Sequence, residues 1–323
     1  GTTITYSFPD ASSDFGPSAG SYGSGEAYDG FEQANALFQE QVRKALDMLA
    51  TIIPVTFVEL TGSDDADAVI RFSMTDATAT AFGYFPGGYA ESGDMWFSAD
   101  RSDFDNPLPG SYGFHVILHE LGHALGLKHG HDTSGYGALP AELDGMTNTV
   151  MTYRSYIGAH DNYYQNAPDS YAQTYMPYDI AALQSLYGVN WDTNAGRTVY
   201  TWDETTGEMS VNGVGPGAPV GAEIVATIWD GGGRYILMLR NCSDDQTIDL
   251  RPGGGARFDD VMLADLSSSV VADATIYFAL SPDGTRRSLI EVAKTGSGND
   301  VIHGNAARNL LAGGSGDDVL YGH

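Results

Sequence analysis

One eleven-residue stretch, HELGHALGLKH from His119 to His129, constrains this chain more than any other. It reads H-E-x-x-H-x-x-G-x-x-H. Residues four apart lie on one face of an α-helix, so His119 and His123 can present two imidazoles to a single metal ion, with Glu120 beside them. A catalytic zinc needs a third protein ligand and an open position for water. The spacing therefore predicts a zinc site.

Gly126 allows the third ligand to reach the metal. A straight helix would carry His129 away from the metal-binding face, but glycine can adopt the left-handed conformation that ends helices and turns the chain back. We therefore expect zinc to be held by His119, His123 and His129. Zinc lowers the pKa of bound water from ~16 towards ~7, and Glu120 can take a proton as that water attacks a peptide carbonyl. These roles predict a zinc endopeptidase.

The alternative is a chance match or a decayed site. A bare H-E-x-x-H is only moderate evidence, because it arises by chance. Gly126, the third histidine and the downstream Met151 in TVMTYRSY are three further coincidences. A decayed site could bind metal without catalysis. The simplest way to abolish catalysis would be the loss of Glu120, and Glu120 is present.

The same motif with a following Met-turn resembles the metzincins, and TITYSFPD, VMTYRS, YDIAALQSLYGVN and the C-terminal glycine-rich repeats resemble the serralysin family of secreted bacterial metalloproteases. The resemblance covers nearly the whole chain. It implies that Met151 forms an apolar floor under the zinc histidines and that Tyr153 lies near zinc and stabilises the transition state. The family often has Pro after the third histidine, whereas this chain has Gly130 and His131.

The charge and cysteine content of the chain restrict the kinds of molecule that it can be expected to bind. The chain has 323 residues, which suits two domains, and its 15 Lys and Arg against 42 Asp and Glu give a net charge of −27. This charge argues against nucleic acid or an anionic membrane surface and favours cations. Cys242 is the only cysteine, so metals rather than an intramolecular disulfide would support an extracellular life. The sequence has no run of ~18 apolar residues, so it predicts no membrane span, and it shows no cleavable signal pattern.

The first 189 residues predict an α+β catalytic domain of the metzincin type. Residues 2–8 alternate as a strand, a polar loop follows, and apolar residues recur at helical spacing from Phe31. VTFVEL, AVIRFSM and DMWFSAD predict further strands, and the zinc helix is expected to begin near Ser111 or Tyr112. A last helix has Pro177 in its first turn and Gly188 just past its end.

The segment ATAFGYFP precedes the zinc helix and has alternating character. In metzincins a strand in this region pairs with extended substrate, and adding a peptide as an extra strand gives affinity through backbone hydrogen bonds. The resemblance therefore predicts substrate-binding residues Ala81, Phe82, Gly83 and Tyr84. The alternative is an ordinary sheet strand.

From residue 190 to 323 short β-rich segments separated by turns predict a second, all-β domain, either a sandwich or a parallel β-roll. Residues from about 295 to 323 form three nine-residue units that fit the calcium repeat G-G-x-G-x-D-x-U-x, the middle unit poorly. One calcium ion is expected between stacked turns, and a flexible Gly-Asp linker is the alternative. The repeats stop after three units, so we expect a trimmed form of a longer protein. By resemblance the calcium ligands are Glu291, Gly296, Gly298, Asp300, Gly314, Gly316 and Asp318.

Two other calcium sites of the family are altered. The segment that matches the family's T-G-D-T places Arg197 at the aspartate, and the segment that matches W-D-x-G-G-x-D ends in Tyr235. A cation and a phenol cannot replace carboxylate ligands of calcium. We therefore expect both sites to be absent or remodelled.

Two classes of function remain. The first is a secreted, monomeric zinc endopeptidase that acts on proteins or peptides and carries structural calcium. The second is an extracellular calcium-dependent adhesion or surface-layer binding protein in which the protease domain is incidental. Glu120 and Tyr153 favour the first class. A combination, a protease held at a cell-surface or surface-layer partner, is a third possibility.

Overall fold

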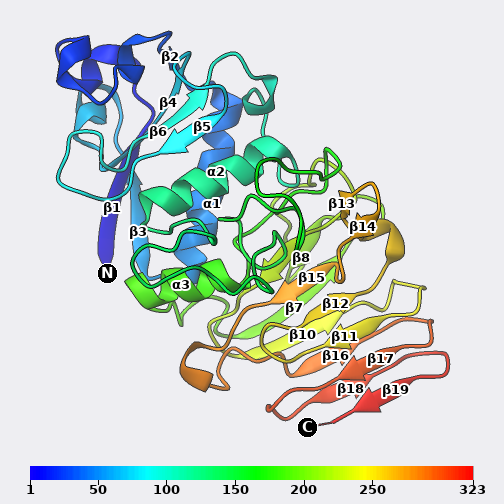
Figure 1. The fold of residues 1–323 in the computed structure, drawn as a ribbon. Coiled ribbons are helices and arrows are strands. Elements are labelled where there is room, and N and C mark those ends of the chain that lie inside the picture. The colour runs from blue at the N-terminus through cyan, green and yellow to red at the C-terminus, as the bar shows by residue number, and fades with distance from the viewer. Residues whose placement is uncertain (323) are drawn as a thin grey trace. The chain divides into compact units, whose positions relative to one another are not determined.

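The computed structural model describes residues 1–322, apart from the side chain of Ala19, and His323 at the end of the predicted repeats lies outside that range. The chain forms two compact units (Figure 1). The first comprises Gly1–Leu108 and Tyr112–Lys128, and the second comprises Pro109–Ser111 and His129–His323. The functional division after residue 189 remains a prediction.

A mixed sheet organises the first unit. Its strand order is β3-β1-β4-β6-β5, with β5 at one edge, and all neighbours are parallel except β5, which runs antiparallel to β6. A short strand, β2, adds to β4 in the antiparallel sense. The predicted strands of this region are therefore confirmed. Their bounds are β1 Thr2–Ser7, β2 Glu32–Gln33, β3 Val55–Glu59, β4 Ile70–Thr75, β5 Ala81–Gly83 and β6 Met95–Ser98.

Helix α1 spans Ala36–Ile52, so the predicted start at Phe31 is wrong. The Asn35 side chain accepts hydrogen bonds from the backbone N–H groups of Leu37 and Phe38, which caps the helix at that point. The residues before Asn35 instead supply β2. From Phe38 onward the apolar stripe is buried as the periodicity predicts, at Phe38, Val42, Ala45, Leu46, Leu49 and Ile52.

The remaining elements of the first unit are short turns and one long helix. Helix α2 spans Tyr112–Ala124, which confirms the predicted start of the zinc helix. Residues from Pro9 to Gly30, predicted as loop, contain isolated 3₁₀ turns. The 3₁₀ segments are η1 Ser12–Phe15, η2 Ala19–Ser21, η3 Glu26–Tyr28, η4 Gly62–Asp67 and η5 Ser102–Phe104.

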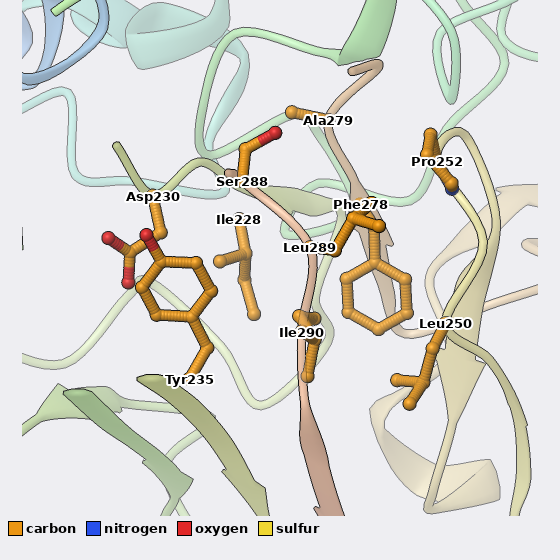
Figure 2. A pocket seen from close by; sticks show the side chains of 10 residues that line it. All are labelled: Ile228, Asp230, Tyr235, Leu250, Pro252, Phe278, Ala279, Ser288, Leu289 and Ile290. Carbon is orange, nitrogen blue, oxygen red and sulfur yellow. The ribbon is translucent and has the colours of Figure 1, made fainter. Parts of the chain in front are cut away.

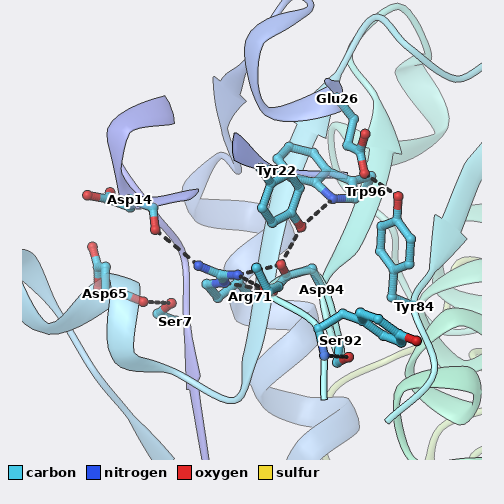
Figure 3. A network of polar contacts seen from close by, with 12 residues as sticks. Ser7, Asp14, Tyr22, Glu26, Asp65, Arg71, Tyr84, Ser92, Asp94 and Trp96 are labelled. Atoms are coloured by element: carbon cyan, nitrogen blue, oxygen red, sulfur yellow. Dashed lines mark hydrogen bonds and ion pairs between the residues drawn. The ribbon is translucent and has the colours of Figure 1, made fainter. Parts of the chain in front are cut away.

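A buried ion pair fixes the N-terminal turns to the sheet (Figure 3). Arg71 on β4 contacts both carboxylate oxygens of Asp94, at 2.7 Å from Nε and 2.6 Å from Nη2. The Tyr22 hydroxyl donates to the same carboxylate, and Arg71 also donates to the backbone oxygens of Asp14 and Ala90. Burial raises the pKa of Asp94 to about 6 although Arg71 opposes that shift.

The second unit begins with a long irregular segment. Between Lys128 and Pro177 the described backbone contains turns but neither helix nor strand. Helix α3 then spans Pro177–Tyr187 and ends at Gly188, as predicted. Within residues 1–322 no helix has the length and apolar composition needed to cross a membrane.

The rest of the second unit is a β-roll in which most neighbouring strands are parallel, whereas the pairs β7–β8, β11–β12 and β12–β15 are antiparallel. Its strands form two sheets, ordered β18-β16-β10-β7-β8 and β19-β17-β11-β12-β15-β9, and the last four strands, β16 to β19, alternate between them (Figure 1). A two-stranded ribbon, β13 with β14, lies outside these sheets. The paired central residues Leu237 with Ala293 and Ile248 with Ile302 are buried in one core. The predicted fold class, an α+β metzincin-type domain followed by a β-roll, is confirmed.

The short strands have these bounds: β7 Arg197–Trp202, β8 Met209–Val211, β9 Ala226–Ile228, β10 Arg234–Met238, β11 Thr247–Asp249, β12 Gly255–Arg257, β13 Asp265–Ser267, β14 Val270–Val271, β15 Ile276–Phe278, β16 Val292–Lys294, β17 Val301–His303, β18 Leu310–Ala312 and β19 Val319–Tyr321. Two 3₁₀ segments accompany them, η6 Asp260–Met262 and η7 Pro282–Gly284.

Arg71→Met is expected to lower the free energy of unfolding by about 3–5 kcal/mol, because it leaves the Asp94 carboxylate buried without its cation. Arg43→Met is the matched control. The Arg43–Glu59 pair is more exposed, with side-chain exposures of 40% and 26%, so its loss should cost about 0–1 kcal/mol. Urea unfolding of both variants measures the difference, and equal losses would contradict the assignment.

Candidate metal centre

Helix α2 places three polar side chains in a buried environment. His119, Glu120 and His123 are only 5%, 6% and 5% exposed. The two histidine rings face the same side, with centroids 4.8 Å apart and an interplanar angle of 89°. The four-residue spacing thus gives the arrangement that two ligands of one ion require.

The helix ends where the motif places its glycine. Gly126 has a φ of 94°, in the left-handed region, and the N–H of Leu127 bonds to the carbonyl of Gly122 at 2.9 Å. This is the type of bonding that closes helices through a left-handed glycine. His129 lies beyond the turn, and His119, His123 and His129 each offer one ligand nitrogen within 4.8 Å of the other two.

His123 is oriented by the chain that leaves the helix. Its Nδ1 lies 2.8 Å from the carbonyl oxygen of Leu127. A carbonyl only accepts, so Nδ1 carries the proton and Nε2 keeps its lone pair for a metal. Burial lowers the pKa of His123, which favours the neutral ring that coordination needs. The ring of Phe85 lies 5.0 Å from the imidazole.

Glu120 lies against strand β5. The backbone N–H of Gly83 donates to its carboxylate, and burial raises the pKa of Glu120 to about 8 despite that bond. A Cβ at Gly83 would lie 2.9 Å from the Glu120 carbonyl oxygen and 3.3 Å from its Oε2. The absence of a side chain at Gly83 therefore allows the strand and the helix to approach closely.

His129 contacts Tyr153 across the loop that follows it. The Tyr153 hydroxyl lies 2.8 Å from His129 Nε2, and the ring centroids are 4.5 Å apart. His131 stacks on His129 with centroids 5.1 Å apart and an interplanar angle of 7°. The departure from the family at this position therefore puts a second imidazole beside the third ligand. The sequence offered no reason to expect that stacking.

Asp179 holds the Met-turn through hydrogen bonds, a role that the sequence did not predict. It accepts hydrogen bonds from Thr149 Oγ1 at 2.5 Å, Val150 N at 2.8 Å and Met176 N at 3.0 Å. Met151, which follows, is buried, and its carbonyl oxygen accepts the N–H of Gly130 at 3.3 Å. The only sequence signal was an acidic residue in the first turn of α3.

The predicted calcium residues fall into two places. Gly314 and Gly316 pack on the carbonyl oxygens of Gly296 and Gly298, so a Cβ at either would lie 2.0 or 2.1 Å from them. Asp318 Oδ1 accepts the N–H of Asp300 at 3.1 Å. These six residues therefore lie on two stacked turns, and the buried Asp300 Oδ2, which has no hydrogen-bond partner, fits a cation there.

Glu291 is the predicted calcium residue that lies apart from the others. Strand β16 separates it from the first repeat turn, and its Oε2 accepts the N–H of Tyr235 at 2.8 Å. Three residues of extended strand span ~10 Å, so Glu291 belongs to the opposite edge of the roll. It therefore does not join the stack of Gly296 to Asp318.

In the segment 229–235, where a remodelled calcium site was expected, tyrosine side chains surround the remaining carboxylate. Asp230 is buried, accepts the Tyr200 hydroxyl at 2.9 Å, and faces the Tyr235 hydroxyl beside a cavity of about 10 Å³ (Figure 2). Burial raises the pKa of Asp230 to about 7. Arg197 is exposed at the start of β7. One carboxylate with two phenols is a poor calcium donor set.

Comparison with known proteins agrees with this geometry. Residues 27–136 match the Matrixin peptidase family, and residues 294–323 match the RTX calcium-binding nonapeptide repeat. The two matches together cover the zinc motif and the stacked turns. The chain is therefore of the metzincin class with RTX repeats.

Curated relatives narrow the class. The chain is 33% identical to "Serralysin" of Proteus mirabilis over 95% of its length, 31% identical to "Serralysin G" of Dickeya chrysanthemi over 88%, and 30% identical to "Metallopeptidase AprA" of Pseudomonas marginalis over 87%. It spans 60%, 57% and 57% of those relatives. The protein is a serralysin-like metzincin, and the predicted zinc and calcium cofactors are supported.

Asp179→Ala is expected to lower the free energy of unfolding by about 2–3 kcal/mol, because it leaves buried donors of the Met-turn without an acceptor. Asp179→Asn keeps one acceptor and should lose less. Urea unfolding at neutral pH measures both, and an equal loss in the two variants would contradict the role.

The same pair of proteins gives a pH test. Burial raises the pKa of Asp179 from 3.8 to about 6, so its contribution favours the folded state below 3.8 and is lost as pH rises through 6. The stability of the parent protein relative to Asp179→Asn should therefore fall between pH 4 and pH 7.

Proposed function

We propose that this chain is a zinc-dependent endopeptidase that hydrolyses proteins or peptides with Glu120 as proton carrier. The observation that carries the proposal is the convergence of three imidazole nitrogens within 4.8 Å beside a buried carboxylate. Two histidines from one helical face and a third beyond a glycine turn fit tetrahedral zinc with an open position. Within residues 1–322 the other three-residue metal-ligand cluster consists only of carboxylates, which suits zinc poorly.

Zinc, when bound, polarises the peptide carbonyl and makes water acidic enough to attack near neutral pH. Glu120 supplies the acid–base chemistry. Its carboxylate is buried next to two ligands, and burial makes it more basic than a solvent-exposed glutamate, while the charge of a bound cation would keep it ionised and able to accept a proton. It takes the proton of the attacking water and passes that proton to the leaving nitrogen. The Gly83 N–H keeps one side of the carboxylate fixed.

Tyr153 is proposed to stabilise the negative charge that develops on the carbonyl oxygen. Its hydroxyl lies at hydrogen-bond distance from His129, one of the proposed ligands, and its side chain is 36% exposed. A hydroxyl donor beside the metal ligand can rotate to the new oxyanion as substrate enters. Met151 is proposed as the apolar floor of the site.

The edge strand β5 is proposed to bind substrate. The backbone N–H of Tyr84 bonds to Asp94 on the inner side, at 2.9 Å, and Phe82 pairs with Trp96. In an antiparallel pair the backbone groups alternate between the two sides, so those of Ala81 and Gly83 face the outer edge. Extended substrate would pair with Ala81 and with the Gly83 carbonyl, while Gly83 N–H stays with Glu120.

The proposal extends to location and assembly. The resemblance to serralysins supports a secreted, monomeric protein acting outside the cell. The chain's single cysteine and its net charge of −27 are compatible with a calcium-stabilised extracellular enzyme. A cell-surface partner would add attachment without changing the chemistry.

Glu120→Gln is expected to reduce casein hydrolysis by about 10²–10⁴-fold while zinc content stays at one per chain, because the amide cannot carry the proton. Glu142→Gln, an exposed neighbour in the following loop, is the control and should keep full activity. Zinc is measured by atomic emission on the same samples. If wild type binds zinc and Glu120→Gln cleaves equally well, the proposed role is wrong.

Tyr153→Phe is expected to lower kcat by about 10²–10³-fold with little change in KM, because it removes a donor used only in the transition state. Tyr163→Phe removes an exposed phenol from the same irregular segment and should leave kcat unchanged. Steady-state kinetics on a fluorogenic peptide distinguish the two. A change confined to KM would reassign Tyr153 to substrate binding.

A further inference from the structure

The segment Arg240–Gln246 has no repeat motif, yet it lies on the first calcium-repeat turn as that turn lies on the next. A Cβ at Gly296 would lie 1.8 Å from the carbonyl oxygen of Cys242, and one at Gly298 would lie 2.2 Å from that of Asp244. The corresponding distances one turn later, from Gly314 to Gly296 O and from Gly316 to Gly298 O, are 2.0 and 2.1 Å.

The side-chain hydrogen bonds repeat in the same register. Asp245 Oδ1 accepts the N–H of Asn299 at 2.7 Å, as Asn299 Oδ1 accepts that of Asp317 at 3.0 Å. Asp300 Oδ1 accepts the N–H of Gln246 at 2.8 Å, as Asp318 Oδ1 accepts the N–H of Asp300 at 3.1 Å.

The backbone continues the correspondence. Val301 N bonds to Gln246 O, and Val319 N bonds to Asp300 O, both at 2.8 Å. The strands that follow pair Thr247 with Val301 and Val301 with Val319. Gln246 therefore occupies the position at which the first and third repeats place their aspartates, Asp300 and Asp318.

Two buried oxygens at this level lack partners. Gln246 and Asp300 are both 0% exposed, and neither Gln246 Oε1 nor Asp300 Oδ2 has a hydrogen-bond partner. Buried acceptor oxygens normally have a hydrogen-bond partner or bind a cation. A single cation between the two turns would satisfy both of these oxygens. The carbonyl oxygens of Arg240 and Cys242 lie close to Gly296 on the same face of the turn.

We propose that Arg240–Gln246 is an additional turn of the calcium stack and that a calcium ion binds between it and the turn Gly296–Asp300. Gln246 Oε1, Asp300 Oδ2 and carbonyl oxygens of the upper turn are the ligands. Calcium accepts this mixture of amide, carboxylate and backbone oxygens. Asp300 then bridges this ion and the one in the repeat below it.

The charges predict the relative affinity of the two sites. The lower site has Asp300 and Asp318, whereas the upper site has Asp300 and a neutral amide. Calcium affinity rises with the number of charged ligands, so the upper site binds more weakly. Asp244 and Asp245 lie on the upper turn and increase its negative potential.

The competing arrangement has no ion. Gln246 Nε2 lies 3.3 Å from Leu239 O and 3.4 Å from Cys242 O, so the amide could itself occupy the place of a cation. Those distances are long for N–H···O bonds, whose usual value is about 2.9–3.0 Å. An amide in that role would also leave Oε1 without a partner.

Calcium stoichiometry of the whole chain tests the proposal, by native mass spectrometry with isothermal titration calorimetry. Gln246→Met keeps the side-chain length but removes its oxygen, and it should bind one calcium fewer than the parent. Gln41→Met removes a buried glutamine from α1 and should bind the parental number. The same number of ions and the same affinities in Gln246→Met and the parent would overturn the proposal.

Gln246→Asp keeps the test decisive if the methionine variant does not fold. It restores the repeat's carboxylate and should tighten the weaker calcium site by about tenfold or more. The increase in Tm on adding calcium should exceed that of the parent. An unchanged calcium affinity would overturn the proposal. Neither readout depends on hydrolysis, so loss of peptidase activity would leave this result intact.

Discussion

The burial of polar side chains in helix α2 is the constraint on which the candidate centre depends. A buried polar group without a partner costs about 1–3 kcal/mol, and α2 buries His119, Glu120 and His123 within two turns. Leu127 and Gly83 satisfy one atom each on His123 and Glu120. A metal ion, when it binds, adds coordination bonds to these buried imidazoles, so metal binding and the stability of this helix are coupled.

The β-roll solves a related problem with oxygen atoms. Its tight turns gather carbonyl oxygens and the buried Asp300 carboxylate, and glycine leaves room for the next turn to approach to about 2 Å from where a Cβ would be. Such oxygens repel unless a cation lies between them. The apolar side chains at the centre of each strand, such as Ile248 and Ile302, pack regardless of the metal. Calcium therefore governs the turns more than the core.

Short sequence patterns correctly predicted the elements whose conformation depends on neighbouring residues. The four-residue spacing in the zinc helix, the glycine at position 126 and the Pro177 to Gly188 helix are all properties of a few consecutive residues, and the structure has these elements where they were expected. The predicted start of α1 was too early because the apolar period extends before Asn35, whose side chain caps the N-terminus of the helix. A capping residue can thus override a hydrophobic period.

What the sequence could not predict depends on register between distant segments. Asp179 bonds to the Met-turn 29 residues earlier, so its role is invisible until both are folded. Glu291 precedes the first repeat, but strand β16 carries it to the other edge of the roll. The Arg240–Gln246 turn contains no glycine, and only its contacts with Gly296 and Gly298 reveal that it belongs to the stack.

The altered site at Asp230 follows from the same electrostatic reasoning. Where relatives of this type were expected to hold calcium with carboxylates, this chain has one carboxylate beside Tyr200 and Tyr235. A phenol hydroxyl donates to a carboxylate and brings no negative charge, so one hydrogen bond replaces part of the stabilisation that a cation would supply. Burial then raises the pKa of Asp230 to about 7, so the carboxyl group is partly protonated near neutral pH. Its smaller negative charge attracts a divalent ion less strongly. The roll thus combines turns that need cations with a segment whose side chains compensate for one another.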